Sequence, residues 1–284
     1  MVRDLLLVLA SGGLLVGMTI TIAMVISAFG KRIIAEEIFL DSLPQAFEGF
    51  RILFITDIHR RLLPQALMLS LKGHVDAVFL GGDITEKNNP MNRLLSNMAL
   101  VTSIAPTYAV HGNHDYNANT SVVDNIIRKS GAVLLVDENV AIERAGGTLW
   151  LTGVDFMVKR GKSAYPPLPP LAVSDTACRI ILVHDPVWLS QRSSVPADLV
   201  LAGHTHGGQV VFPFFGRRHV ETFYQEYDAG WFILPKGDES KTFAKLLISR
   251  GFGTAHLPLR FRSPAEIHVL TLRNSTSKGE SQSQ

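Results

Sequence analysis

The sequence predicts an α/β protein with mixed sheets, built as a layered sandwich and preceded by one N-terminal transmembrane helix. Three observations support this class. An apolar run without a charged residue occupies residues 5–30, short β-branched runs alternate with helical periodicity from residue 51 onward, and strand-like runs dominate after residue 207.

Composition excludes several other classes. The chain has 284 residues, enough for a large core, and its hydrophobic fraction of 46% excludes general disorder. One cysteine excludes an intramolecular disulfide and a Cys-rich zinc module, so any bound metal must use oxygen and imidazole ligands. The net charge of +2 provides no extensive basic surface, and no specific nucleic-acid partner is expected.

The N-terminal apolar run is long enough to span a membrane. A helix rises about 1.5 Å per residue, and the hydrocarbon core of a bilayer is about 30 Å thick. A cleaved signal peptide is the competing interpretation, but the run is long for one and residues 27–30 (Ser-Ala-Phe-Gly) form a poor cleavage site. A buried core helix would be unusual without a polar face. We therefore expect residues 1–34 to form a single-pass anchor in the cell membrane.

The charges beside this run bear on its orientation. Arg3 is partly offset by Asp4 on one side, whereas Lys31 and Arg32 follow on the other. The positive-inside rule therefore gives the rest of the chain only a slight bias toward the cytoplasm.

After a mixed polar connector over residues 31–49, short buried strands alternate with helices. The predicted strands cover residues 51–56, 76–80, 107–110, 179–183 and 198–202, and the predicted helices cover residues 62–71, 91–101 and 121–129.

The second half of the chain is predicted to contain more strands than helices. Two strand-like runs within residues 132–155 flank residues 144–147, which predict a hairpin turn. Residues 163–170 are Pro-rich and indicate a surface loop, and residues 266–272 form the last strand. We expect one domain over residues 35–273 and a disordered polar tail over residues 274–284.

Each of the five predicted strands leads into Asp, Asn or His residues. Any one of these has an ordinary explanation as a turn former, a helix cap or a packed histidine. Ligands bind at the carboxyl ends of strands in open α/β sheets, however, and five coincident placements indicate a shared metal site. The residues, in strand order, are Asp57 and His59; Asp83; Asn113, His114 and Asp115; His184; and His204 and His206.

The donors are too numerous for one metal ion that must also keep an open position. Seven oxygen and nitrogen donors suit two ions, with one carboxylate, best assigned to Asp83, bridging both. Two divalent ions about 3.5–4 Å apart clamp a phosphate ester and lower the pKa of a bridging water. The mixture of oxygen and imidazole ligands favours Mn, Fe, Zn or Co over Mg or Ca.

The same residues resemble the sequence blocks of the calcineurin-like metallophosphoesterase superfamily. The family's blocks read D-x-H, G-D, G-N-H-D/E, a lone H after a strand, and G-H-x-H, and all five occur here in order within residues 50–210. The resemblance implies a metal-dependent phosphoric ester hydrolase with a four-layer α-β-β-α sandwich fold.

The resemblance also implies a role for each residue. His114 would lie near the leaving group, as a general acid or as a stabiliser of the phosphoryl charge, with Asp115 orienting it. One ion would take Asp57, His59, Asp83 and His206, and the other would take Asp83, Asn113, His184 and His204.

Residues 43–50, 207–209 and 250–261 are further similar to a bacterial membrane-associated branch that includes phosphodiesterases and a UDP-2,3-diacylglucosamine pyrophosphatase. The resemblance implies a phosphodiester or pyrophosphate substrate, lipid-linked or nucleotide, with the UDP-2,3-diacylglucosamine-type activity as a specific alternative. Anchoring favours a lipid-linked substrate, because it raises the local concentration. A non-catalytic scaffold of the same fold is the alternative from another class, and the retention of every expected ligand argues against it.

Two positions depart from the family pattern. Many members carry Gly two residues after the first His, where this chain has Arg60 and Arg61. We interpret these arginines as surface residues or as bidentate contacts to a substrate phosphate. His111 precedes the third block where an aliphatic or aromatic residue is common, and we expect it to pack or to support a ligand rather than to bind metal.

Overall fold

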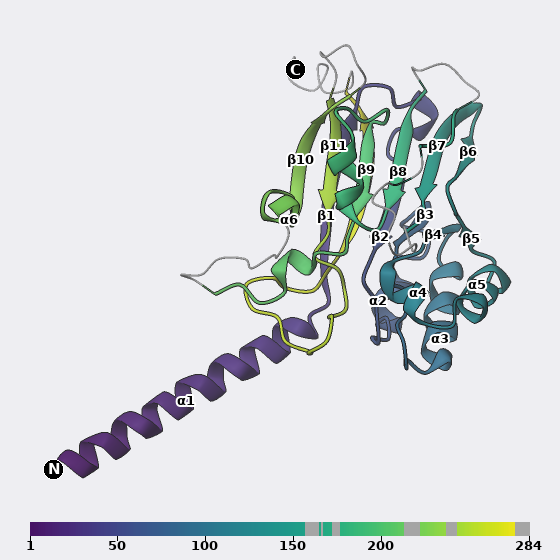
Figure 1. The fold of residues 1–284 in the computed structure, drawn as a ribbon. Coiled ribbons are helices and arrows are strands. Elements are labelled where there is room, and N and C mark those ends of the chain that lie inside the picture. Colours follow the sequence, from purple (N-terminus) through teal and green to yellow (C-terminus); the bar gives the residue numbers. More distant parts are fainter. Residues whose placement is uncertain (157–164, 166, 172–176, 213–221, 237–242, 276–284) are drawn as a thin grey trace.

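Two six-stranded sheets pack face to face at the centre of the molecule (Figure 1). The computed structural model describes the chain except for residues 157–164, 166, 172–176, 213–221, 237–242 and 276–284. The first sheet has the strand order β1-β12-β2-β3-β4-β5, and the second has the order β10-β11-β9-β8-β7-β6. Both sheets are mixed, with parallel strands in the middle and antiparallel pairs β12·β2, β10·β11 and β6·β7.

The strands of the first sheet are β1 (Arg32–Leu40), β2 (Arg51–Ile55), β3 (Ala77–Gly81), β4 (Thr107–Val110), β5 (Val133–Leu134) and β12 (Glu266–Asn274). Those of the second are β6 (Glu138–Arg144), β7 (Gly147–Val154), β8 (Arg179–Val183), β9 (Leu199–Ala202), β10 (Gly230–Pro235) and β11 (Phe243–Ile248). The helices are α1 (Val2–Ala28), α2 (Gln65–Ser70), α3 (Met91–Thr102), α4 (Asn113–Asn117), α5 (Thr120–Lys129) and α6 (Thr222–Glu226). Short 3-10 turns cover Gln45–Phe47, Pro186–Gln191 and His206–Gly208.

Strand alternation explains the layers. In β2, Ile52 and Phe54 face the second sheet and join the central core, whereas Leu53 faces the other way and packs among residues of α2, α3 and α5. On the far side of the second sheet, the turn over Pro186–Gln191 contributes Trp188, and α6 contributes Phe223 to the third core. The predicted α-β-β-α sandwich is therefore confirmed, with a thin outer layer on the second sheet.

The five strands predicted to carry the site all form, as do the β6–β7 hairpin and the helices at 91–101 and 121–129. The helix predicted over residues 62–71 is shorter, because Pro64 caps it and α2 begins at Gln65. Within the predicted Pro-rich loop, residues 163, 164 and 166 lie outside the described residues, and residues 165 and 167–170 form neither a helix nor a strand. The tail from residue 276 onward also lies outside the described residues.

The connector predicted over residues 31–49 is wrong for its first half, because β1 pairs with β12 over Arg32–Leu40. This strand lies at the edge of the sheet and is largely half-exposed, so charged residues such as Glu36 and Glu37 interrupt its apolar pattern. The predicted boundary after residue 34 lies inside β1, and the predicted start of the tail, Asn274, is the last residue of β12.

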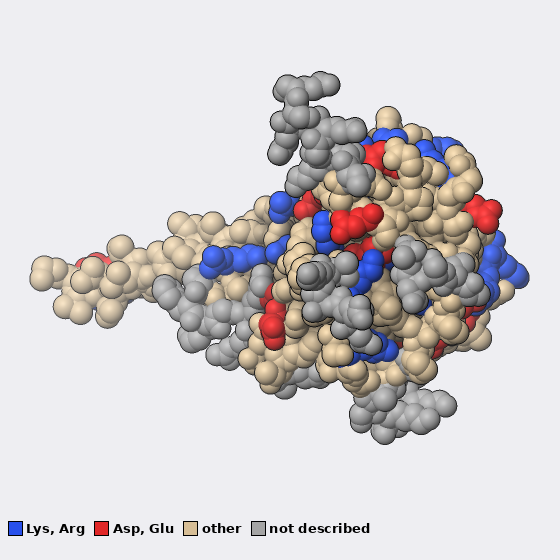
Figure 2. All heavy atoms as spheres, turned by 90° about the horizontal axis from the view of Figure 1, so that it is seen from above, with Lys and Arg blue, Asp and Glu red and all other residues tan. Residues whose placement is uncertain are grey.

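Helix α1 projects away from the sandwich (Figure 1). Only Met24 and Ala28 of this helix are buried, both near its last turn. Within the described part of the chain it is the one helix long and apolar enough to cross a membrane, a test that a signal sequence would also pass. Viewed from above, it forms a nearly uncharged projection, while charges of both signs are scattered over the domain (Figure 2).

Candidate metal centre

All seven predicted metal ligands meet at the carboxyl ends of β2, β3, β4, β8 and β9. The first three strands belong to one sheet and the last two to the other, so the site lies at the seam between the sheets. Parallel neighbours β2·β3·β4 and β8·β9 deliver their following loops to the same edge, which is why residues far apart in sequence converge.

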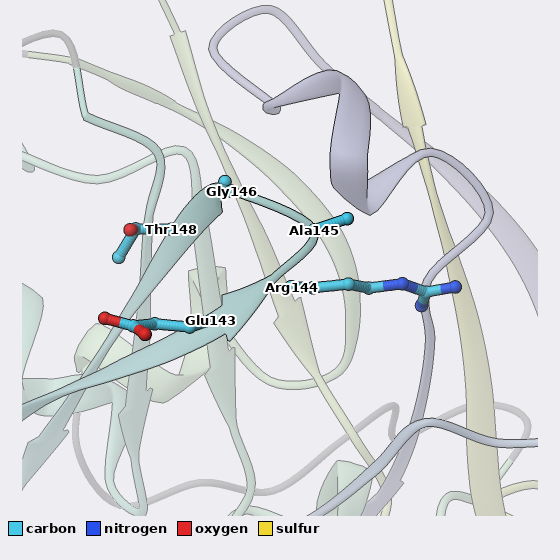
Figure 3. Close-up of a pocket in the computed structure, with 6 residues that line it drawn as sticks. Glu143, Arg144, Ala145, Gly146 and Thr148 are labelled. Carbon is cyan, nitrogen blue, oxygen red and sulfur yellow. The ribbon is translucent and has the colours of Figure 1, made fainter.

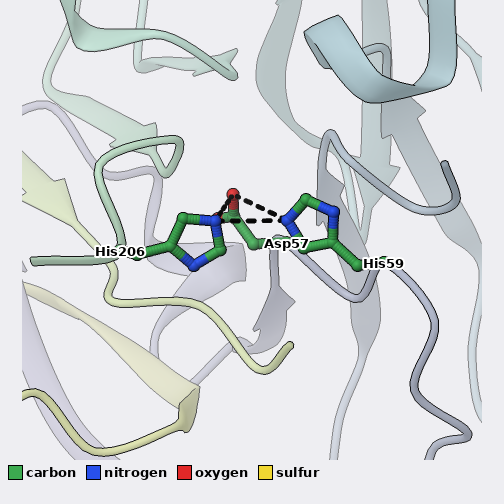
Figure 4. Close-up of side chains that lie close together, drawn as sticks. All are labelled: Asp57, His59 and His206. Carbon is green, nitrogen blue, oxygen red and sulfur yellow. Dashed lines mark hydrogen bonds and ion pairs between the residues drawn. The ribbon is translucent and has the colours of Figure 1, made fainter. Parts of the chain in front are cut away.

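The first group of donors is Asp57, His59 and His206 (Figure 4). Nε2 of His59 and Nε2 of His206 lie 3.2 Å apart, and Oδ1 of Asp57 lies 4.0 Å and 3.4 Å from them respectively. This oxygen is buried and accepts no hydrogen bond from any described residue, whereas Oδ2 accepts from Thr56. An orphaned buried carboxylate oxygen facing two imidazole nitrogens is the arrangement that a divalent cation satisfies.

The second group lies on the other side of Asp83. Oδ2 of Asp83 is 3.3 Å from Nε2 of His184 and 3.7 Å from Nε2 of His59, so this carboxylate lies between the two groups. Nδ1 of His204 is 3.3 Å from Nε2 of His184 and 3.1 Å from Oδ1 of Asn113. Nδ1 of His184 donates to the Gly81 carbonyl at 2.8 Å, which leaves Nε2 free to face the site.

Backbone strain is concentrated at this centre. Asp57, His59, Asp83, His204 and His206 all have φ between 50° and 72°, a left-handed conformation that residues other than glycine seldom adopt. Such conformations cost of order 1–3 kcal/mol each and persist where the surroundings enforce them. Five of the seven predicted ligands therefore carry a conformational cost that serves the placement of their side chains.

Two glycines pack closely against the proposed carboxylate ligands. A Cβ atom on Gly112 would lie 2.2 Å from Oδ1 of Asp83, and one on Gly251 would lie 2.6 Å from Cβ of Asp57. Neither position can carry a side chain without displacing a proposed ligand.

The charges of the site favour cation binding. Burial alone would lower the pKa of His184, because it disfavours the charged ring. The attraction of the Asp83 carboxylate is stronger and raises this pKa to about 10. Burial alone would lower the pKa of His59, but the nearby carboxylates of Glu86 and Asp83 outweigh it, and the pKa is raised. A raised histidine pKa indicates an excess of negative charge around the ring, and bound divalent cations would neutralise that charge.

His206 behaves in the opposite way. Burial, together with the positive charges of His59 and Arg260, lowers its pKa well below the ordinary value. The ring is therefore neutral, as a metal ligand must be.

His114 lies at the edge of the first group. Its ring meets the His59 ring edge-on at a centroid distance of 4.8 Å, and its backbone N–H donates to Oδ1 of Asp83 at 2.8 Å. The side chain is half-buried, and burial lowers its pKa. A neutral imidazole facing the site can donate a hydrogen bond to an incoming phosphoryl oxygen.

Asp115 acts through the backbone rather than on the His114 ring. Its carboxylate accepts from the N–H groups of Gly112, Ile84 and Thr85, at 2.8, 3.2 and 2.9 Å. Among the described contacts none joins it to the imidazole of His114. It thus ties the loop after β4 to the loop after β3, and any orientation of His114 is transmitted through the main chain.

Two residues of the site were not assigned a role from the sequence. Glu86 places Oε2 3.1 Å from Nδ1 of His59, a carboxylate–histidine contact that orients a ligand ring. Arg260 is fully buried, and its guanidinium lies 3.1 Å from Nδ1 of His206 and donates to the carbonyls of Gly253 and Ser263. Glu86 lies in the loop after β3, three residues after Asp83, whereas Arg260 reaches the site from the distant segment before β12.

The structure separates the two arginines that the sequence treated together. Arg60 is exposed and pairs with Glu86, which agrees with a surface position. Arg61 is not a free surface residue, because its guanidinium donates to backbone carbonyls at the end of α1.

His111 packs between Asp155 and Asp124, at 2.8 Å from each, away from the metal-binding groups.

A surface hollow of about 320 Å³ lies at the β6–β7 turn (Figure 3). This turn is at the end of the sandwich opposite the metal-binding loops (Figure 1). It is lined by Glu143, Arg144, Ala145, Gly146, Gly147 and Thr148. None of the six lining residues belongs to a group of metal-binding side chains.

Comparison with known proteins finds one matching family and several relatives. Residues 50–208 match the family described as calcineurin-like phosphoesterase. The chain is 32% identical over 224 residues to the uncharacterized protein YpbG of Bacillus subtilis, covering 78% of this chain and 80% of that protein. It is 25% identical over 244 residues to the uncharacterized metallophosphoesterase YkuE of the same organism, covering 82% of each. It is 28% identical over 193 residues to phosphodiesterase YaeI of Escherichia coli, covering 64% of this chain and 69% of that protein.

Proposed function

The chain belongs to the calcineurin-like phosphoesterase family and is a metal-dependent phosphoric ester hydrolase, and from that premise we propose a finer function. It is a two-metal phosphodiesterase or pyrophosphatase that α1 attaches to the membrane and whose catalytic domain begins with β1. The position of Asp83 is the main support for this proposal. Its Oδ2 atom lies between His59 and His184, so two groups of donors can share it.

The proposed ligands follow from that geometry. One cation is held by Asp57, His59, His206 and Asp83, and a second by Asp83, Asn113, His184 and His204. Mn, Fe, Zn or Co suits this mixture of oxygen and imidazole donors. Bound divalent ions supply Lewis-acid stabilisation of the phosphate and a water of lowered pKa.

The chain's own residues bind and orient the ester. His114, neutral because burial lowers its pKa, donates a hydrogen bond to a phosphoryl or leaving-group oxygen. Glu86 holds the His59 ring, and Asp115 holds the loop that carries His114. Because the pKa of His114 is lowered, charge stabilisation by hydrogen bonding is favoured over proton donation at neutral pH.

The proposed substrate is a lipid-linked or nucleotide phosphodiester or pyrophosphate. Similarity to a relative named as a phosphodiesterase supports the diester class. Membrane attachment favours a lipid-linked ester, because a tethered site meets such a substrate at high local concentration. The UDP-2,3-diacylglucosamine-type pyrophosphatase is the specific alternative within this class.

The test compares three variants of the full-length protein in detergent, with Mn²⁺ and bis(p-nitrophenyl) phosphate. Asp83→Ala should lose both bound metal and hydrolysis. His114→Ala should keep the metal and lower kcat about a hundredfold or more, the range for a positioned proton or charge partner. His74→Ala, which removes an exposed imidazole far from the site, should retain the wild-type rate.

Equal rates in the wild type, Asp83→Ala and His114→Ala would contradict the proposal. Elemental analysis of the wild type decides the scaffold alternative separately, since a scaffold would hold no stoichiometric metal. Chelation followed by addition of each metal alone then identifies the ion that restores the rate.

A further inference from the structure

Arg61 joins the metal centre to the end of α1. Its guanidinium donates to the carbonyls of Ala28, Phe29 and Gly30 at 3.1, 3.2 and 3.1 Å, and also to the carbonyl of Phe252. The same group lies over the Phe252 ring, 3.6 Å from its centroid. Arg61 follows the proposed ligand His59 by two residues, so its backbone belongs to the loop that carries this ligand.

This contact satisfies the end of a helix. The last carbonyls of α1 have no partner within the helix, and a cation there also interacts favourably with the helix dipole. Burial lowers the pKa of Arg61 to about 10, so the side chain is still charged at neutral pH. A planar guanidinium can reach several carbonyls at once, which a lysine ammonium on a flexible stem matches less well.

A second segment binds α1 and the metal centre at the same time. The N–H of Arg260 donates to the Met24 carbonyl at 3.1 Å, and that of Ala265 donates to the Ser27 carbonyl at 3.4 Å. Residues 252 and 253 of the same segment donate backbone hydrogen bonds to Thr56 and Asp57. The last turn of α1 is therefore packed against the loop that lines the site.

The segment that contacts the last turns of α1 carries exposed apolar and basic side chains, and one further exposed apolar side chain packs against it. Leu257 is 64% exposed and Phe212 is 50% exposed, and Phe212 packs against Phe261 with ring centroids 6.0 Å apart. Lys31 and Arg262 are exposed near the same end of the helix. Exposed apolar residues flanked by cations are typical of a surface that meets anionic headgroups.

The length of α1 sets the depth of this surface. Its 27 residues span about 40 Å, whereas the hydrocarbon core of a bilayer is about 30 Å thick. The last turns of α1, and the loop docked on them, then lie at the level of the headgroups. Figure 1 shows this loop on the side of the sandwich from which α1 departs.

We propose that α1 is a docked element rather than a flexible tether, and that Leu257 and Phe212 rest in the headgroup layer of the bilayer that α1 spans. Arg61 is the positioning residue that holds this geometry, so the metal centre faces the membrane at a fixed height. The proposal rests on the proposed membrane attachment and adds to it the orientation of the site. The partner is the lipid surface itself.

The test measures contact with lipid in the full-length protein, reconstituted in nanodiscs that contain anionic lipid and nitroxide-headgroup lipid. A fluorophore is attached at Leu257→Cys, or for comparison at Ala145→Cys on the exposed β6–β7 turn. That turn precedes β7, whose other end leads to the site, so it marks the far end of the sandwich. The native Cys178 is buried and does not compete for the label.

The label at residue 257 should be quenched by the nitroxide lipid and the label at residue 145 should not. Arg61→Ala should abolish most of the quenching at residue 257, while Arg60→Ala, the adjacent exposed arginine, should leave it unchanged. Arg61→Lys, which keeps the charge without the fork of donors, should lose part of the quenching and serves if Arg61→Ala does not fold.

Equal quenching at residues 257 and 145 in the wild type would overturn the orientation. Wild-type quenching retained in folded Arg61→Ala and Arg61→Lys would overturn the role of Arg61. Failure of the protein to elute with the discs would instead refute membrane attachment. Absence of metal-dependent diester hydrolysis with normal quenching would refute the proposed catalytic function alone.

Discussion

At the scale of single residues, surroundings rather than residue type decide what a histidine does. His111 belongs to the loop after β4 and is held between Asp155, which follows β7, and Asp124 of α5. Burial alone would lower its pKa, but hydrogen bonds to the two carboxylates outweigh it and raise the pKa to about 9. The charged ring therefore links the two sheets, while His206, beside Arg260, is kept neutral.

The shift at His111 predicts a dependence of stability on pH. A folded-state pKa above the unfolded value of 6.5 stabilises the fold fully below about pH 6.5, and this stabilisation is lost as the pH rises through about 9. It amounts to at most about 3 kcal/mol, at 1.36 kcal/mol per pKa unit. Urea unfolding of detergent-solubilised protein at pH 6.5 and pH 9.5 should show a smaller loss of free energy of unfolding in His111→Gln than in the wild type. Identical losses in both proteins would show that His111 is not the titrating group.

At the scale of elements, the β6–β7 hairpin has a two-residue turn in which one residue, Ala145, does not suit the backbone geometry. Arg144 pairs with Gly147, so the turn consists of Ala145 and Gly146, with φ of 47° and 81°. Two consecutive left-handed residues define the type I′ turn, for which Asn-Gly is the preferred pair. Gly146 adopts this conformation freely, whereas the methyl group of Ala145 is strained in it.

Relief of that strain should stabilise the protein. Ala145→Asn should raise the free energy of unfolding by about 0.5–1 kcal/mol, because Asn tolerates the left-handed conformation better than Ala. The β6–β7 turn lies at the far end of the sandwich from the metal-binding loops (Figure 1), so the hydrolysis rate should not change. Urea unfolding measures the gain, and Gly146→Ala provides the control of opposite sign. A destabilised Ala145→Asn would mean that the turn has another geometry in solution.

At the scale of the whole molecule, the proposed anchor and the metal-binding loops lie at the same end of the sandwich. The sheets bring the metal-binding loops together at one end, and α1 leaves from that same end (Figure 1). An anchor placed there would keep the site close to the bilayer, whereas an anchor at the β6–β7 end would hold it away. The proposed preference for a membrane-borne ester therefore depends on topology as much as on the residues of the site.

Membrane attachment makes a prediction for the intact protein. The full-length chain should remain in the membrane fraction after extraction with alkaline carbonate, because a spanning helix is held by its buried apolar length. Deletion of residues 1–34 should release the domain unless the loss of β1 pairing prevents folding, so a deletion of residues 1–30 is made in parallel. A mature protein whose mass lacks the apolar run would show instead that it is a cleaved signal sequence.

The sequence predicted most of the fold because its strands are short, β-branched and buried on both faces. β2, β3, β8 and β9 bury nearly every residue, so their composition alone indicates them. β1 was missed because an edge strand keeps charged residues on its open side, and the strand is defined by its pairing with β12. Pairing across more than two hundred residues leaves no signal in a local pattern.

The sequence by itself determined the chemistry, since the order and type of Asp, Asn and His residues after five strands already predict a phosphoesterase metal site. Tertiary structure alone decided which donors face each other, that Asp115 binds backbone amides, and that Arg61 holds α1 while Arg60 pairs with Glu86. Residue types follow from local chemistry, but these contacts depend on loops that only the packing of two sheets brings within hydrogen-bond distance.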